Sequence, residues 1–122
     1  MAACGAQKPV DPITNITWQW VGLVETQPAS QSVVPNPENY TLTFLPDGSL
    51  SIKADCNMAS GTYALEGNTL SIELGATTMA YCGEQSMDQQ YLANLGNVAG
   101  YIMADGQLVL ALKDTTGKMT FK

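Results

Sequence analysis

Apolar residues alternate with polar residues in three short runs in the middle of the chain, and this period of two constrains the fold most strongly. In the first run Tyr40, Leu42 and Phe44 are separated by two threonines. The same alternation recurs at residues 50–54 and again at residues 70–74. Successive side chains of a β-strand point to opposite faces. Each run is therefore expected to be a strand with one face on a core and the other in water.

Turn-forming residues separate these runs and recur near the C-terminus. The pairs are Asp47-Gly48, Gly67-Asn68, Asp105-Gly106 and Thr116-Gly117. Asp-Gly is typical of hairpins because its positive-φ conformation matches the twist of antiparallel strands. We also expect residues 57–61 to form a turn, and residues 26–39 to form a proline-containing loop. The pattern predicts an antiparallel meander.

The ends of the chain extend this meander. Residues 15–25 are expected to form the first strand, and the last strands carry apolar residues on one side, namely Leu108, Leu110, Leu112, Met119 and Phe121. The total of eight or nine short strands favours a curled sheet over an open one. The predicted fold class is α+β and mostly β, with a strongly bent antiparallel sheet or partly open barrel and one helix.

Residues 86–96 predict the one helix. Ser86 and Gln89 fit a capping box, and Gly96 stands where a helix would end. The apolar side chains at helical spacing on one side are Met87, Tyr91, Leu92 and Leu95. We expect this helix to close the core against the sheet, and the alternative is a lid over an apolar cleft.

Composition excludes several classes of function. The chain has eleven acidic residues, five basic residues and no histidine, and its formal net charge is −6. Five scattered lysines cannot supply the basic surface that nucleic acid requires. Without histidine, neither a Ser-His-Asp triad nor a histidine-ligated zinc site can form. We expect no enzyme activity, cofactor or metal. The alternative is a hydrolase that pairs Asp55 with Glu84 or Asp88.

The N-terminus resembles the end of a bacterial lipoprotein signal. Ala2-Ala3 precedes Cys4 as the small residues precede the cysteine that receives the lipid. We expect residues 1–14 to be a flexible arm and tether, and residues 15–122 to be the folded domain. The protein would then be extracytoplasmic, touching the membrane only through this anchor. The alternative is an ordinary cytosolic start.

The remaining two cysteines are expected to pair. In an exported protein, three cysteines suggest one disulfide and one cysteine with another role. A bond between Cys56 and Cys82 would stabilise the fold by about 3 to 4 kcal/mol on the chain-entropy model. Two buried free thiols are the alternative.

Aromatic residues provide the candidate surface for a ligand or partner. Trp18 and Trp20 lie two apart and therefore on one face of the first strand, where paired tryptophans usually anchor a core. A face that stacks on a sugar or another ligand is the alternative. The candidate surface comprises Trp18, Trp20, Tyr63, Tyr81 and Tyr91.

Several of these pieces together resemble the META domain, found in the small HslJ-like proteins of bacterial envelopes. The resemblance covers about residues 15–122 and is carried by Ala54-Asp55-Cys56-Asn57, Gly61-Thr62-Tyr63, Thr78-Met79-Ala80-Tyr81-Cys82 and a terminal Gly-x-Met-x-Phe. It implies one α+β domain with a bent antiparallel sheet, often exported or lipid-anchored, with links to heat shock and novobiocin resistance and no established catalysis. Members commonly carry arginine where Met58 and Thr120 stand here, so no role that needs a basic surface is expected.

The resulting functional hypothesis is a monomeric, non-enzymatic envelope lipoprotein, a stress-related binding or scaffold module. Its partner would be another envelope protein or a hydrophobic ligand. The alternatives are a secretion-pilot-like protein that holds a hydrophobic ligand, and a protease inhibitor. The inhibitor would present the turn after Cys56 or residues 82–85, braced by the disulfide.

Overall fold

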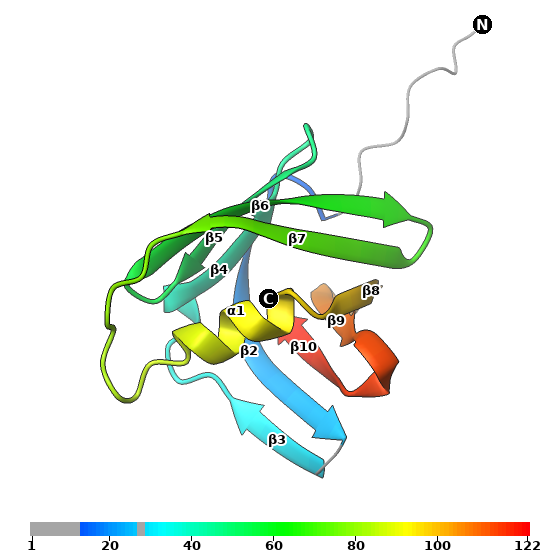
Figure 1. Cartoon of the computed structure of the whole chain (residues 1–122). Helices are drawn as coiled ribbons and strands as arrows, with labels where there is room; N and C mark the ends of the chain where they lie inside the picture. Colours follow the sequence, from blue (N-terminus) through cyan, green and yellow to red (C-terminus); the bar gives the residue numbers. More distant parts are fainter. Residues whose placement is uncertain (1–12, 27–28) are drawn as a thin grey trace, which may run out of the picture.

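Nine antiparallel strands and one helix make up the computed structural model, which describes residues 13–26 and 29–122 (Figure 1). The strands are β2 (Thr17–Thr26), β3 (Ala29–Val33), β4 (Tyr40–Phe44), β5 (Ser49–Ala54), β6 (Asn57–Glu66), β7 (Thr69–Thr77), β8 (Val98–Ala104), β9 (Gln107–Leu112) and β10 (Gly117–Phe121). The helix α1 spans Asp88–Leu95, and two short 3-10 turns span Pro37–Asn39 and Lys113–Thr115.

The strands pair into one sheet that returns upon itself. Their order is β10-β9-β8-β7-β6-β5-β4-β2-β3, and β10 also pairs with β2. Hydrogen bonding therefore forms a ring, and β3 extends the sheet beyond β2. The expected bent antiparallel sheet with eight or nine strands and one helix is confirmed.

The junction between β2 and β10 closes the ring, and the junction between β7 and β8 is its weakest. Strands β2 and β10 pair at five positions from Gly117 to Phe121. Strands β7 and β8 pair only where Thr69 meets Gly100. Figure 1 shows α1 leading into β8. The helix packs against the core, where its Tyr91 and Leu95 are fully buried.

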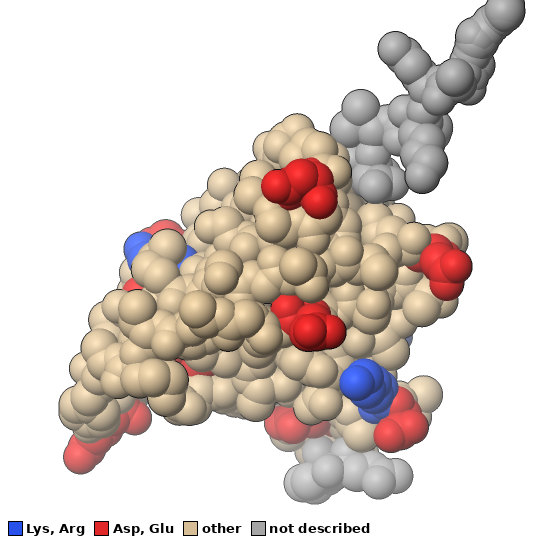
Figure 2. Space-filling model, turned by 45° about the horizontal axis from the view of Figure 1, so that its top comes forward, with Lys and Arg blue, Asp and Glu red and all other residues tan. Residues whose placement is uncertain are grey.

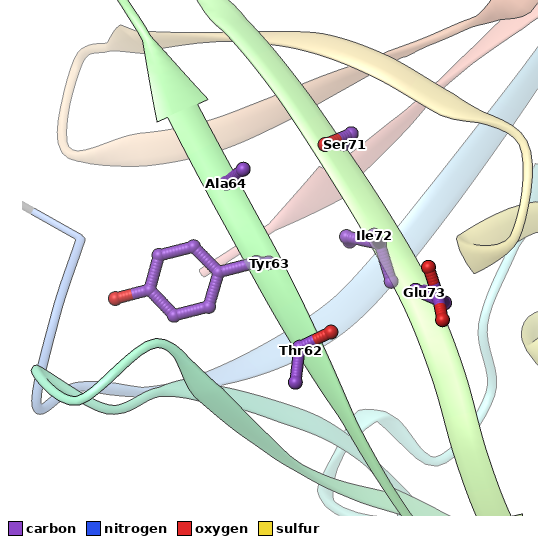
Figure 3. A pocket seen from close by; sticks show the side chains of 6 residues that line it. All are labelled: Thr62, Tyr63, Ala64, Ser71, Ile72 and Glu73. Carbon is purple, nitrogen blue, oxygen red and sulfur yellow. The ribbon is translucent and has the colours of Figure 1, made fainter.

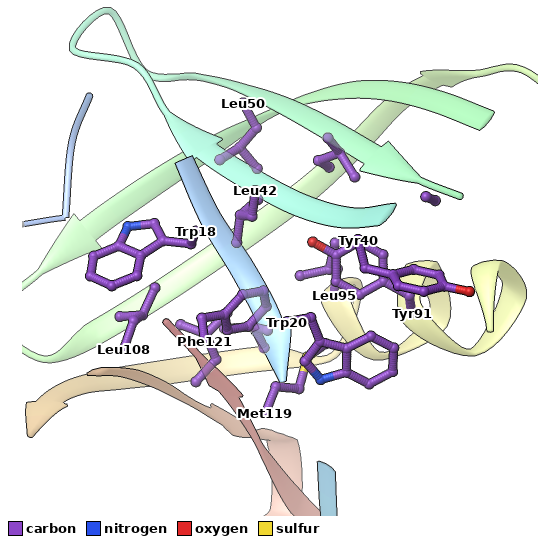
Figure 4. Close-up of a cluster of buried hydrophobic side chains, with 14 of the residues drawn as sticks. Trp18, Trp20, Tyr40, Leu42, Leu50, Tyr91, Leu95, Leu108, Met119 and Phe121 are labelled. Atoms are coloured by element: carbon purple, nitrogen blue, oxygen red, sulfur yellow. The ribbon is translucent and has the colours of Figure 1, made fainter. Parts of the chain in front are cut away.

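The alternating residues form that core, as predicted. The buried set includes Leu42, Phe44, Leu50, Ile52, Leu70, Leu108, Leu110, Leu112, Met119 and Phe121. Trp20 stacks on Tyr91 with ring centroids 5.0 Å apart, and Tyr40 meets Tyr91 edge-on at 5.7 Å (Figure 4). The Tyr91 hydroxyl donates to the Thr41 carbonyl oxygen over 2.8 Å. Burial raises the pKa of Tyr91 well above its usual value, because the interior disfavours the phenolate.

Two expected turns are wrong. Residues 57–61 lie in β6, because the chain reverses one step earlier, at Asp55, whose φ is +60°. Gly117 lies in β10 rather than in a turn, and the preceding reversal uses Asp114 and Thr115 at positive φ. A Cβ at position 117 would lie 2.5 Å from the Val24 carbonyl oxygen, so glycine is required there for close strand approach.

The helix begins two residues later than expected, and one strand went unpredicted. The Asp88 N–H donates to the Ser86 hydroxyl over 3.2 Å, so Ser86 does not cap the helix through Gln89. The helix ends before Gly96, as expected. Strand β3 lies in the expected proline-containing loop. All of its residues except Ser32 are exposed, so it carries no apolar alternation to reveal it.

The folded domain begins earlier than residue 15. Ile13 is fully buried, and its carbonyl oxygen accepts a 3.0 Å hydrogen bond from the Trp18 indole. Thr14 is also buried and forms a bridge with Phe44. These two residues belong to the packed domain and not to the arm. The rest of the predicted arm, including Cys4, lies outside the described residues.

Candidate functional site

The predicted disulfide between Cys56 and Cys82 is present. It joins the turn between β5 and β6 to the segment between β7 and α1, with Cα atoms 5.5 Å apart. The alternative of two free thiols is therefore wrong. This bond fixes the end of a segment that has no regular secondary structure, residues 78–82, which we call the braced loop.

The side chain of Asn57 holds the middle of the braced loop. Its Oδ1 accepts hydrogen bonds from the Ala80 N–H over 2.7 Å and from the Thr78 hydroxyl over 2.9 Å. Its Nδ2 donates to the Ala80 carbonyl oxygen and to Asp88 Oδ2, each over 3.0 Å. Asn57 is only 1% exposed. The buried Asn57 side-chain amide thus pairs with the backbone N–H and C=O of Ala80, as the backbone of a neighbouring strand would.

Hydrogen bonds to β6 hold the start of the loop. The Thr78 N–H donates to the Met58 carbonyl oxygen over 3.0 Å, and the Met58 N–H donates to the Thr78 hydroxyl over 2.9 Å. Thr78, Ala80 and Cys82 are therefore all attached to the protein. The intervening residues Met79 and Tyr81 make no hydrogen bond within the described part of the chain.

Three apolar side chains are exposed on and beside the braced loop. Tyr81 is 80% exposed, Met79 is 77% exposed, and Met58 on the adjacent strand is 53% exposed. We call these residues the exposed apolar set. Met58 also lines a shallow hollow, together with Ala59, Ser60, Ala76, Thr77 and Thr78. The loop therefore presents apolar side chains on a backbone that Asn57, strand β6 and the disulfide hold in place.

The network continues into the start of α1. Asp88 is buried, and its carboxylate accepts hydrogen bonds from Asn57 and, over 3.0 Å, from the Ser86 hydroxyl. The Met87 N–H donates to the Tyr40 hydroxyl over 2.8 Å. Asp88 thus has a structural role, which weighs against its use as an acid–base partner of Asp55. No group of three or more metal-ligating residues occurs among the described residues.

Most of the predicted aromatic surface lies inside the protein. Trp18 is 4% exposed, and Trp20 and Tyr91 are fully buried. The prediction that these three residues form a surface is therefore wrong, because they pack in the core. Burying the apolar area of these side chains in the core stabilises the protein more than exposing it on a ligand-stacking face, the alternative for the two tryptophans. Tyr63 is half-buried, and its hydroxyl donates to the Leu45 carbonyl oxygen over 2.7 Å. Only Tyr81 is fully on the surface.

Sequence reasoning missed Met58, Met79 and Asn57 as parts of the site. The pattern Cys-Asn followed by Thr-Met-Ala-x-Cys was recognised. Asn57, however, was assigned to a turn and not to a side chain that holds a distant loop. Asn57 pairs with residues 23 positions away, so local pattern could not reveal its partners. The two methionines carry no sign of exposure in the sequence, because methionine is a residue that commonly fills gaps in cores.

A second hollow, of about 210 Å³, lies along β6 and β7 (Figure 3). It is lined by Thr62, Tyr63, Ala64, Ser71, Ile72 and Glu73. Glu73 is the one carboxylate in this lining, so the hollow lacks the pair of acid–base groups that hydrolysis needs.

Charge is dispersed on the face shown in Figure 2. Acidic side chains form separate patches there, and uncharged residues cover most of the face between them. Such a face offers no concentrated field for steering a charged partner. No helix in the part of the chain that the structure describes is long and apolar enough to cross a membrane.

Comparison with known proteins identifies the family. A family model, the META domain, matches residues 11–122. An NMR structure of a protein from Burkholderia xenovorans is similar with a TM-score of 0.69 and 24% identity, covering 100% of this chain and 97% of that one. A crystal structure of a DUF4847 family protein from Bacteroides vulgatus has a TM-score of 0.68 and 15% identity, covering 91% and 94%.

Both likenesses to solved structures concern the fold alone. A search of curated proteins finds no match. The family model extends over nearly the whole chain. The protein therefore belongs to the META domain family.

Proposed function

We propose that the protein is a non-enzymatic binding module of the bacterial cell envelope, anchored by a lipid on Cys4 and active as a monomer in a stress-related role. Its contact surface for another envelope protein is the exposed apolar set. The observation that carries this proposal is the exposure of three apolar side chains on and beside a loop fixed by both Asn57 and the disulfide.

Rigidity and exposure together favour binding. Methionine and tyrosine are enriched where protein interfaces exclude water. An already ordered loop loses less conformational entropy on association than a flexible one, so more of its contact energy appears as affinity. Isolated exposed apolar residues are ordinary, but here two lie on one braced loop and the third is the strand residue that is hydrogen-bonded to its start.

An extracytoplasmic location rests on chemistry at two separate places. The disulfide is of the kind that persists in oxidising compartments outside the bacterial cytoplasm. The sequence Ala2-Ala3-Cys4 is the lipoprotein-like feature at the N-terminus. If the anchor is correct, replacing Cys4 with serine in the precursor will move the protein from the membrane fraction to the soluble fraction.

The absence of catalysis is part of the proposal. The sequence has no histidine, and the buried carboxylate of Asp88 is committed to hydrogen bonds with Asn57 and Ser86. A general acid needs a reactive carboxyl group within reach of substrate. Hydrolysis of ester or glycoside substrates that disappears in Asp55→Asn would contradict this part of the proposal.

Site-specific photo-crosslinking in cells tests the contact surface. A photoreactive phenylalanine replaces Tyr81 in one variant and Val33 in a control, because Val33 is equally exposed, at 79%, but lies on β3. Crosslinking from position 81 to one envelope protein, without the same product from position 33, is the expected result. Equal products from both positions, or none from position 81, would reject the braced loop as the contact surface.

A further inference from the structure

The braced loop has one attached edge and one free edge. Thr78 and Ala80 form hydrogen bonds with β6 and with Asn57, whereas Met79 and Tyr81 form none within the described residues. In an extended chain, the backbone N–H and C=O groups of successive residues point to opposite edges, so those of alternate residues share one edge. The N–H and C=O groups of Met79 and Tyr81 are therefore available to a partner on the outward side.

A free edge of this kind suits a partner that binds extended backbone. The extended ligand adds a strand to such a partner through main-chain hydrogen bonds, and pockets of the partner select alternate side chains. The free groups here belong to alternate residues, Met79 and Tyr81. Their side chains are also the ones that project, at 77% and 80% exposure. Met79 and Tyr81 thus offer a partner both their backbone groups and their side chains.

The attached edge is suited to an inhibitor rather than to a substrate. A protease substrate is a flexible segment whose two halves separate after cleavage. Here Ala80, the residue after Met79, is held through both its N–H and its C=O by the buried Asn57. The chain is fixed on either side by Thr78 and by the disulfide at Cys82. Both halves of a cleaved loop would stay in place.

The projecting side chains indicate the specificity of the cleft. Met79 is long, unbranched and apolar, and so is suited to the hydrophobic slot that chymotrypsin-like proteases present to the residue before the cleaved bond. Tyr81, two residues further, is an aromatic group of the type that anchors tight interfaces. Neither residue carries a charge that a trypsin-like pocket would require.

We propose that residues 78–82 bind in the active-site cleft of a serine protease with an apolar primary pocket, and that Met79 occupies this pocket. The protein then acts as a reversible inhibitor. This inference rests on the proposed function, because it requires the braced loop to be the contact surface. It adds the class of partner and the residue that determines specificity.

Inhibition constants against chymotrypsin, subtilisin and trypsin test the inference. The oxidised wild-type protein is expected to inhibit chymotrypsin and subtilisin but not trypsin. Met79→Lys is expected to weaken chymotrypsin inhibition at least about a hundredfold, as loss of an anchor residue does, and to create inhibition of trypsin. Val33→Lys is the matched control, with the same new charge at an equally exposed apolar residue, and is expected to change nothing.

Three results would overturn the inference. These are no inhibition of chymotrypsin or subtilisin by excess oxidised protein, inhibition that Met79→Lys leaves unchanged, and rapid cleavage of the loop as an ordinary substrate. None of them affects the crosslinking test of the proposed function. Crosslinking from position 81 to an envelope protein that is not a protease would preserve the binding module and refute this choice of partner.

Discussion

Tyr91 and Tyr81 show how position gives the same side chain two different roles. Tyr91 is fully buried, stacked on Trp20 and hydrogen-bonded to Thr41. Tyr81 is 80% exposed and makes no hydrogen bond within the described chain. The first side chain contributes stability by leaving water. The second contributes almost none, and so remains available for a partner.

The two regions are nevertheless coupled. Asp88, at the start of α1, accepts a hydrogen bond from the same Asn57 amide that holds Ala80. Tyr91 lies one turn further along this helix. The packing of Trp20, Tyr40 and Tyr91, the buried aromatic cluster, thus fixes the helix. The start of the helix in turn helps to fix Asn57, which holds the loop that presents the exposed apolar set.

The largest effect is expected at the buried aromatic cluster. Trp20→Ala should lower the free energy of unfolding by about 3 to 5 kcal/mol, because it removes a fully buried ring and leaves a cavity. Equilibrium denaturation by urea measures the change. A loss below about 1 kcal/mol would erase the distinction between this cluster and the exposed apolar set.

Removal of the disulfide should have the next largest effect. The double variant Cys56→Ala with Cys82→Ala should unfold with a free energy lower by about 3 to 4 kcal/mol, because the unfolded chain regains the entropy of an open loop. Denaturant titration of this variant beside the oxidised wild type gives the difference. Equal midpoints would show that Asn57 and the strands constrain the loop without help from the bond.

Alkaline pH should act selectively on the buried tyrosine. The pKa of Tyr91 is raised in the folded protein, so its contribution to stability is full below the unfolded value near 10 and is lost as pH rises above it. The slope from this group approaches about 1.4 kcal/mol per pH unit. Stability measured at pH 9 and pH 11 should show this loss in the wild type.

Tyr91→Phe is the matched variant for that measurement. It keeps the ring and removes the ionisable hydroxyl, at a cost of about 1 kcal/mol for the lost hydrogen bond. Its stability should fall less between pH 9 and pH 11 than that of the wild type. An identical fall in both proteins would assign the alkaline transition to other groups.

The smallest effect is expected at the exposed apolar set. Tyr81→Ser should change the free energy of unfolding by less than about 0.5 kcal/mol, because the ring is already in water. The same variant should lose the partner contact. A destabilisation of 2 kcal/mol or more, on the order of a core substitution, would show that Tyr81 has a structural role.

Local pattern predicted the framework well because strands and turns repeat short-range rules. The alternation of Leu108 and Leu110 and the turn at Asp105-Gly106 each depend on a few neighbouring residues. Strand β3 was missed because its exposed residues carry no such alternation. The true start of α1 was missed because Ser86 bonds a residue two positions on rather than three.

The site was less predictable, because its arrangement depends on contacts between distant segments. The disulfide could be inferred from the number of cysteines and from the expectation that the protein is exported. The pairing of Asn57 with Ala80 is a tertiary contact that no spacing rule describes. Burial of Trp18 and exposure of Tyr81 likewise depend on where the closed sheet places each residue, since aromatic residues serve both cores and interfaces.

Amide hydrogen exchange within the braced loop tests the central claim most directly, which is that Asn57 holds one edge of this loop and leaves the other free. Followed by NMR, the Ala80 amide should exchange at least about a hundredfold more slowly than the amides of Met79 and Tyr81, and Asn57→Ala should abolish this difference. Equally fast exchange of all three amides in the wild type, or protection of Ala80 that survives in Asn57→Ala, would contradict the claim.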